Sequence, residues 1–137
     1  MVSHSKTQRY LRHLCNQHRV RLLVLIEPMS NVDLLDAICT MLHFNNCRSF
    51  LEGKIWIFWV DEFKILFQEM ADQMVAMTVS SMLGYSFCFS AAYARCTRVG
   101  RRSLWRAMEE MAARISSPWL VTVDFNVVSK AEERSEG

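Results

Sequence analysis

Four polar side chains that could act on a phosphate or hold a metal ion stand where apolar segments end. Glu27 and Asp124 each follow a continuous apolar run, and Tyr93 closes an alternating one. Asn126 lies two residues beyond Asp124. A strand end is a common place for chemistry, because the strand fixes the backbone while the edge of the sheet stays open to solvent. We therefore take these four residues as candidates for one site.

The residue types of this set suit a hard divalent cation and a phosphate. Mg²⁺ usually takes one or two carboxylates and keeps several waters, so Glu27 and Asp124 would be enough if they met at one edge. Asp124 and Asn126 point to the same side if the strand continues, and one could act as acid or base while the other donates an amide hydrogen bond. The simpler alternative is a proline turn after Glu27 and an Asx turn at Asp124. The spacing leaves both interpretations open.

The elements that must position these residues belong to one mixed α/β domain. Apolar residues at helical spacing predict helices over residues 5–19, 32–42 and 101–115, with Asn31 as the cap of the second. Continuous apolar runs predict buried strands over residues 21–27 and 119–123. The middle of the chain predicts four short strands in an antiparallel meander, over residues 54–60, 65–70, 73–79 and 85–93. Sheets of this kind must be covered by helices on their outer faces.

Composition limits the class of protein. The 137 residues, 51% of them hydrophobic, are enough for the core of one domain, and a net charge of +2 does not by itself indicate nucleic-acid or membrane binding. Five cysteines without a C-x-x-C pair predict reduced, mostly buried thiols rather than a disulfide frame or a zinc site. With no signal peptide and no run long enough to span a membrane, we expect an intracellular protein that makes no membrane contact.

Basic residues gather in two segments. The first 21 residues contain five lysines and arginines and no acid, and a second cluster contains Arg95, Arg98, Arg101, Arg102 and Arg106. Such clusters are usually solvated surfaces, and they are also the pattern of a surface that binds a polyanion.

The sequence around Asp124 resembles a known motif. The segment WLVTVDFNVV resembles the W-x-x-x-G-D-F-N motif of the endonuclease/exonuclease/phosphatase superfamily, and especially the apurinic-type endonuclease domain of plant LINE-type, non-LTR retrotransposons. Three upstream segments resemble the family in the same order, namely LLVLIEP (the strand ending in the metal-binding Glu), GKIWIFWVDEF (the aromatic hairpin) and AAYARCTRVGRRSLWRAMEEM (the active-site Tyr and the following helix). The resemblance implies a partial four-layer α/β sandwich, with two mixed β-sheets flanked by helices, as a single truncated domain over residues 5–137.

The same resemblance implies a role for each candidate residue. Glu27 corresponds to the carboxylate that binds Mg²⁺, and Tyr93 to the tyrosine that contacts the phosphate. Asp124 corresponds to the acid that handles a proton of the attacking water or the leaving group, and Asn126 to the amide that orients water and phosphate. The implied reaction is Mg²⁺-assisted hydrolysis of a DNA phosphodiester. Candidates for contact with the DNA backbone are Arg95, Arg98, Arg101 and Arg102. The family also implies a reverse transcriptase domain in the parent polyprotein, and action on DNA implies a nuclear location.

The chain departs from the family pattern in three places. The asparagine of the family's W-N strand and the histidine of its S-D-H motif have no match, and Val123 stands where the family has glycine. We therefore expect a weak or inactive fragment of a hydrolase, truncated at both ends, with exposed apolar surface where strands are missing. One alternative is a non-catalytic remnant that at most binds nucleic acid through basic residues. Another is an unrelated α/β domain that acts in protein interaction.

Overall fold

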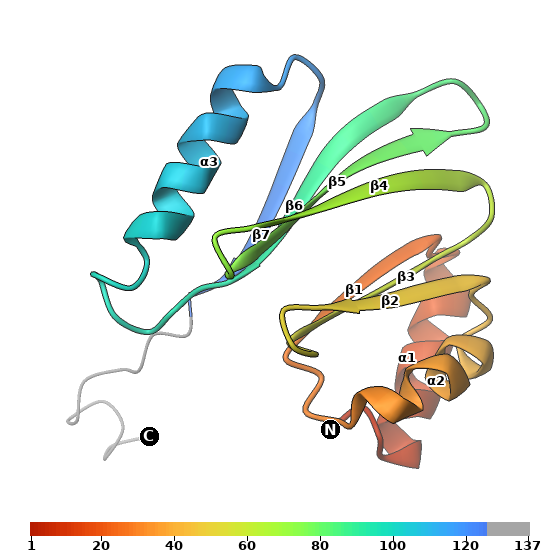
Figure 1. The fold of residues 1–137 in the computed structure, drawn as a ribbon. Helices are drawn as coiled ribbons and strands as arrows, with labels where there is room; N and C mark the ends of the chain where they lie inside the picture. Colours follow the sequence, from red (N-terminus) through yellow and green to blue (C-terminus); the bar gives the residue numbers. More distant parts are fainter. Residues whose placement is uncertain (126–137) are drawn as a thin grey trace.

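The computed structural model describes residues 1–125, and residues 126–137 lie outside the described part. Two β-sheets pack face to face, and helices cover their outer faces (Figure 1). The elements in chain order are α1 (Ser5–His18), β1 (Leu22–Ile26), the 3₁₀ helix η1 (Val32–Leu34), α2 (Leu35–Met41), β2 (Asn46–Phe50), β3 (Ile55–Trp59), β4 (Phe63–Met70), β5 (Met74–Ser81), β6 (Ser86–Tyr93), α3 (Arg102–Arg114) and β7 (Trp119–Asp124). No helix of residues 1–125 is both long and apolar enough to cross a bilayer.

The strand order defines the two sheets. The first sheet has the order β1-β3-β2, and both pairs are antiparallel. The second has the order β4-β5-β6-β7, in which β4, β5 and β6 form an antiparallel meander and β7 pairs with β6 in parallel. The connection from β6 to β7 runs through α3, as a parallel pair requires. The predicted layered α/β fold with two sheets flanked by helices is confirmed, but only the second sheet is mixed, because the first is wholly antiparallel.

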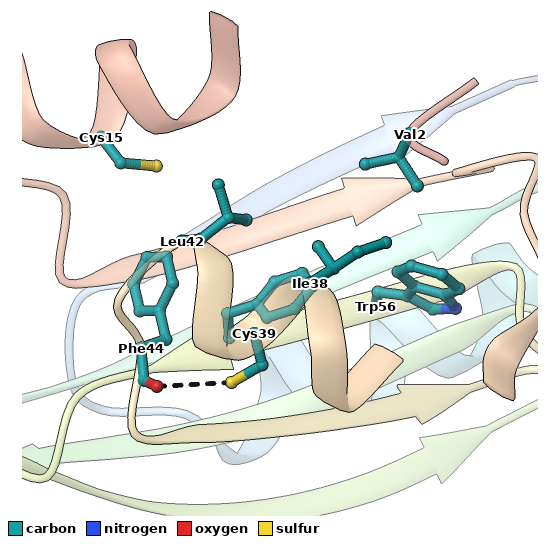
Figure 2. Close-up of a cluster of buried hydrophobic side chains, with 8 residues drawn as sticks. Val2, Cys15, Ile38, Cys39, Leu42, Phe44 and Trp56 are labelled. Atoms are coloured by element: carbon teal, nitrogen blue, oxygen red, sulfur yellow. Dashed lines mark hydrogen bonds between the residues drawn. The ribbon is translucent and has the colours of Figure 1, made fainter. Parts of the chain in front are cut away.

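Strand β3 lies at the centre of the molecule, and its apolar run is buried on both sides. Ile55, Trp56, Ile57 and Phe58 are all 0% exposed. Trp56 and Phe58 face the layer of α1 and α2, where Figure 2 shows Trp56 with Ile38 and its neighbours from α2. Ile55 and Ile57 face the second sheet, because successive side chains of a strand point to opposite faces. A strand between two layers therefore needs the unbroken apolar sequence found here.

The second sheet is covered on its outer face by α3. Leu104, Ala107 and Met111 of this helix are buried against the outward-facing residues of β5 and β6, which include Met74 and Ala92. The predicted helix over residues 101–115 is confirmed. The predicted first helix, over residues 5–19, is also confirmed, and its Cys15 is buried toward the first sheet.

Four details of the predicted secondary structure are corrected. The segment 54–60 is not part of the meander, because β3 pairs with β1 and β2 instead. Strand β2, whose sequence NCRSF contains no β-branched residue, was not predicted; only Phe50 within it is buried. The predicted helix over residues 32–42 begins as the 3₁₀ turn η1 before α2, with Asn31 accepting from the N–H of Asp33 at 2.9 Å. The two strands predicted as buried, β1 and β7, both lie at sheet edges, where β1 is half-buried along its length and β7 is partly exposed.

The five cysteines are free thiols, as the sequence predicted. Three of them are buried, Cys47 is half-buried and Cys96 is exposed.

Candidate functional site

Tyr93 and Asp124 are neighbours on the inner face of the second sheet. The parallel pairing of β6 with β7 places the two residues directly opposite one another. Paired residues of adjacent strands share a face, and the two strands lie about 4.8 Å apart in the direction of their hydrogen bonds. Tyr93 packs against the cluster between the two sheets, so Asp124 also points to the side of the first sheet. The predicted juxtaposition of these two strand ends is present.

Glu27 reaches the same place from the first sheet. It follows the last residue of β1, and its backbone N–H donates to the carbonyl of Lys54 at 2.6 Å, which extends the pairing of β1 with β3 by one bond. Glu27 has a φ of 54°, a left-handed conformation that costs about 1–3 kcal/mol for a residue with a side chain. Such strained residues are concentrated at functional sites, where the surrounding structure maintains them. At Glu27 the chain therefore turns away from the direction of β1.

The side chains of these three residues interact. Burial raises the pKa of Tyr93, and a hydrogen bond with Glu27 and the negative charges of Glu27 and Asp124 raise it further. Tyr93 is thus a neutral phenol that can donate a hydrogen bond, held between a carboxylate from each sheet. Two carboxylates that act on the same phenol form a region of negative charge that a divalent cation would offset.

The carboxylates of this group suit Mg²⁺, which keeps several water ligands, better than a metal ion that is coordinated by protein side chains alone. Within residues 1–125 no group of three or more His, Cys, Asp or Glu side chains has the geometry of a metal site. Mg²⁺ needs only one or two carboxylates, because water and substrate phosphate complete its shell. Glu27 and Asp124 carry carboxylate oxygens of the kind that such an ion takes.

Two hollows lie beside this group. A pocket of about 750 Å³ is lined by Tyr93 and the following residues and by the β2–β3 and β4–β5 turns. A smaller pocket of about 290 Å³ is lined by Glu27 and the residues after it. Glu52 and Lys54 line both pockets, so the β2–β3 turn lies between them.

Lys54 was not predicted as a site residue. Its Nζ lies 5.5 Å from the centre of the Tyr93 ring, in the range of a cation–π contact. In the sequence, the feature that could have indicated Lys54 is its position just before the aromatic strand β3. This strand pairs with β1, which leads into Glu27. That feature becomes informative only once β3 is known to pair with β1.

Gln73 is the second residue that the sequence reasoning missed. It is 1% exposed, and its amide donates to the carbonyl of Gly100 and the hydroxyl of Ser103, both at 2.9 Å. Its side-chain oxygen accepts from the N–H of Arg95 at 2.8 Å, and its backbone carbonyl accepts from the N–H of Tyr93, also at 2.8 Å. Gln73 therefore ties the end of β6 to the loop before α3. A single glutamine at the start of a strand gives no sign of this role.

The predicted DNA-contact arginines occupy different surroundings. Arg95 is exposed and lines the larger pocket, and Arg98 and Arg102 are also exposed. The guanidinium of Arg101 donates to the carbonyls of Arg95 and Cys96, both at 3.3 Å, and so holds the loop that carries them. The remaining predicted residue, Asn126, lies outside the described residues.

Comparison with known proteins supports the fold assignment. No family model matches this chain, and a search of curated proteins finds no match either. Among solved structures, the chain resembles the human Nocturnin catalytic domain with bound sulfate anion, with a TM-score of 0.60 and 13% sequence identity. The match covers 97% of this chain and 62% of the Nocturnin chain, so the chain spans less than two thirds of that domain. The chain has an endonuclease/exonuclease/phosphatase-like fold.

Proposed function

We propose that this chain provides a site for Mg²⁺-assisted hydrolysis of a phosphodiester, with DNA as the substrate. The observation that carries the proposal is the meeting of Glu27 from the first sheet with Asp124 from the second at the phenol of Tyr93. Both carboxylates follow or end strands of a fold that the Nocturnin catalytic domain shares. The sulfate bound to that domain is a tetrahedral anion like phosphate, which is consistent with anion binding by this fold.

Each residue has a distinct part in the proposed reaction. Glu27 would hold Mg²⁺, which when bound would polarise the scissile phosphate and offset its developing charge. On phosphate binding, the neutral phenol of Tyr93 would exchange its hydrogen bond to Glu27 for one to a phosphate oxygen. Asp124 handles the proton of the attacking water or of the leaving group, and Asn126 orients the water and phosphate. Water adds to phosphorus, the bond to the leaving oxygen breaks, and that oxygen takes up a proton.

The exposed arginines in and after the loop that lines the larger pocket fit a polymeric substrate. Arg95, Arg98 and Arg102 extend from the end of β6 to the start of α3, where they can contact phosphates of a DNA backbone without reading its sequence. We also propose an origin in a LINE-type retrotransposon of plant type, with a reverse transcriptase in the parent polyprotein and action in the nucleus. The four ordered sequence motifs support this part of the proposal.

Nicking of supercoiled plasmid tests the hydrolase proposal. We expect weak nicking in Mg²⁺ that EDTA abolishes, and a decrease of about 100-fold or more in Glu27→Gln and in Asp124→Asn. Glu109→Gln, which removes one carboxylate from the exposed face of α3, should nick like the parent protein. Nicking that persists undiminished in both site variants would reject the proposal.

A second candidate is binding of nucleic acid without cleavage. Three exposed arginines, of which Arg95 lines the larger pocket, favour it. A protein that unfolds cooperatively in urea, binds DNA with a steep salt dependence and does not nick plasmid would have this function and not the first.

A further inference from the structure

We infer that Lys54 is a phosphate-binding residue of this site, whose ammonium group contacts the substrate phosphate beside Glu27 and Tyr93. The inference rests on the proposed function, since it assigns one more ligand to the same phosphate. It also indicates the class of substrate, because a cation shared by two adjacent pockets suits a chain of phosphates that passes from one pocket to the other.

The β2–β3 turn fixes the backbone of Lys54. Leu51, Glu52 and Gly53 have φ angles of 53°, 54° and 84°, and the N–H of Lys54 donates to the carbonyl of Leu51 at 3.1 Å. Gly53 has the largest of these three positive φ angles, and it avoids the steric cost that a side chain would add there. The carbonyl of Lys54 then accepts from the N–H of Glu27, so the same residue anchors the proposed metal ligand.

The side chain of Lys54 lies at the junction of the site. Its ammonium group is 5.5 Å from the centre of the Tyr93 ring, while the side chain of Tyr93 hydrogen-bonds with Glu27. Lys54 lines the pocket beside Glu27 and also the pocket beside Tyr93 and Arg95. A phosphate placed beside the Glu27–Tyr93 pair would therefore have the Lys54 ammonium within reach. In the larger pocket, Arg95 supplies a second cation for the next phosphate.

The charged residues that line the larger pocket determine the conditions under which a phosphate can bind there. Its lining contains the acids Glu52, Glu69 and Asp72 and the cations Lys54 and Arg95. A phosphate that arrives alone meets more negative than positive charge. Binding at Lys54 should therefore need a divalent cation, which offsets the carboxylates.

A purely structural role of Lys54 is the competing explanation. A cation–π contact at a partly exposed site contributes about 0.5–1 kcal/mol, and the backbone bond to Glu27 does not need the lysine side chain. In that case, removal of the ammonium would alter stability slightly and leave phosphate binding unchanged. The two explanations differ in ligand affinity rather than in folding.

Fluorescence anisotropy with a short, labelled, phosphorothioate DNA duplex tests the inference, in Mg²⁺ and in EDTA. We expect Lys54→Gln to weaken binding in Mg²⁺ by about tenfold or more, as for loss of a charge-assisted hydrogen bond. Lys54→Arg keeps the positive charge and should lose less than about threefold. The matched control is Lys64→Gln, which removes the same charge from an exposed position on β4 and should bind within about twofold of the parent protein.

Three results would overturn the inference: binding by Lys54→Gln equal to that of the parent protein, an equal loss in Lys64→Gln, or no Mg²⁺-dependent binding by the parent protein. If Lys54→Gln fails to unfold cooperatively, the side-chain NMR signal of Lys54 in the parent protein decides instead. It must shift when the duplex is added in Mg²⁺, and an unmoved signal overturns the inference. Plasmid nicking separates this test from that of the proposed function. Nicking that does not depend on Lys54 rejects only the inference, and Lys54-dependent binding without nicking rejects only the hydrolase.

Discussion

The two sheets differ in how completely the rest of the chain covers them. In the first sheet, β3 lies between two other strands and also between two layers, and four consecutive residues have no exposed surface. The second sheet has exposed leucines on both of its edge strands. Leu66 on β4 is 77% exposed and Leu120 on β7 is 58% exposed. The first sheet is thus the more protected part of the fold.

The candidate site joins these unequal parts. Glu27 comes from the well-covered sheet, whereas Tyr93 and Asp124 come from the sheet with the open edge. Asp124 lies on the edge strand itself. The geometry of the site therefore depends on how firmly the second sheet is held against the first, and four measurements examine this difference.

The largest effect is expected from Trp56→Ala in β3. Replacement of a fully buried aromatic residue by alanine costs about 3–5 kcal/mol, which is a large share of the about 5–15 kcal/mol that stabilises a typical domain. Nε1 of Trp56 is buried without a hydrogen-bond partner among the described residues, so loss of this group offsets part of the cost. Urea denaturation measures the change.

Trp105→Ala in α3 is the matched control, because Trp105 is 39% exposed and its contact with Phe125 has a ring-centre distance of 5.7 Å. We expect a cost of about 1 kcal/mol there. Equal losses of stability in the two variants would contradict the view that the first sheet is the better protected part.

A smaller effect on stability, with a larger one on the site, is expected from Gln73→Leu. The variant leaves the N–H of Arg95 and the carbonyl of Gly100 without their buried partner, which costs about 1–3 kcal/mol. Because Gln73 holds the segment that follows Tyr93, binding of DNA in Mg²⁺ should weaken as well. Gln68→Leu, at an exposed position of β4 in the same hairpin, should change neither quantity. A Gln73→Leu protein of lower stability but full affinity would show that the contacts of Gln73 do not position the site.

The sequence predicted the layers well because each layer has its own hydrophobic pattern. The helical spacing of α1 and α3 and the apolar run of β1 each specify the type of element within a short stretch of sequence. The run over residues 54–60 was recognised as a strand, but its placement in the first sheet was not. A strand buried on both faces has the same sequence pattern in either sheet, so the pattern cannot choose between them.

The residues of the candidate site also fall into two groups, those that the sequence could indicate and those that it could not. Glu27, Tyr93 and Asp124 could be proposed from the sequence, because each is a polar residue that closes an apolar segment. Lys54 and Gln73 could not, since their roles depend on contacts between turns that lie far apart along the chain. The pairing of strands that are distant in the sequence determines these contacts. The residues of a single strand do not show which other strand it pairs with.

The open edge of the second sheet is expected to affect association more than stability. Edge strands with exposed apolar residues pair readily with other chains, and a lysine there opposes such pairing. Leu120→Lys should therefore reduce self-association in sedimentation velocity and change the free energy of unfolding by no more than about 0.5 kcal/mol. Leu66→Lys makes the same change on β4, the other edge. A larger reduction from Leu66→Lys would show that β4, and not β7, is the edge that associates.

The smallest structural disturbance comes from labelling the cysteines, which compares the two sheets without a mutation. Burial and hydrogen bonds with Asp36 and Cys39 raise the pKa of Cys47, on β2, from its usual 9.0 to about 12. The thiolate is the reactive form, and its fraction falls tenfold for each pH unit below the pKa, so only about one thiol in 1,000 is ionised at pH 9. Cys96, in the loop of the candidate site, is exposed. Iodoacetamide at pH 8–9 should thus modify Cys96 long before Cys47, with peptide mass spectrometry as the measurement, and labelling of Cys47 should rise steeply as the pH approaches 12. Early labelling of Cys47 would mean that the layer over the first sheet opens as readily as the site loop, which would remove the difference between the two sheets.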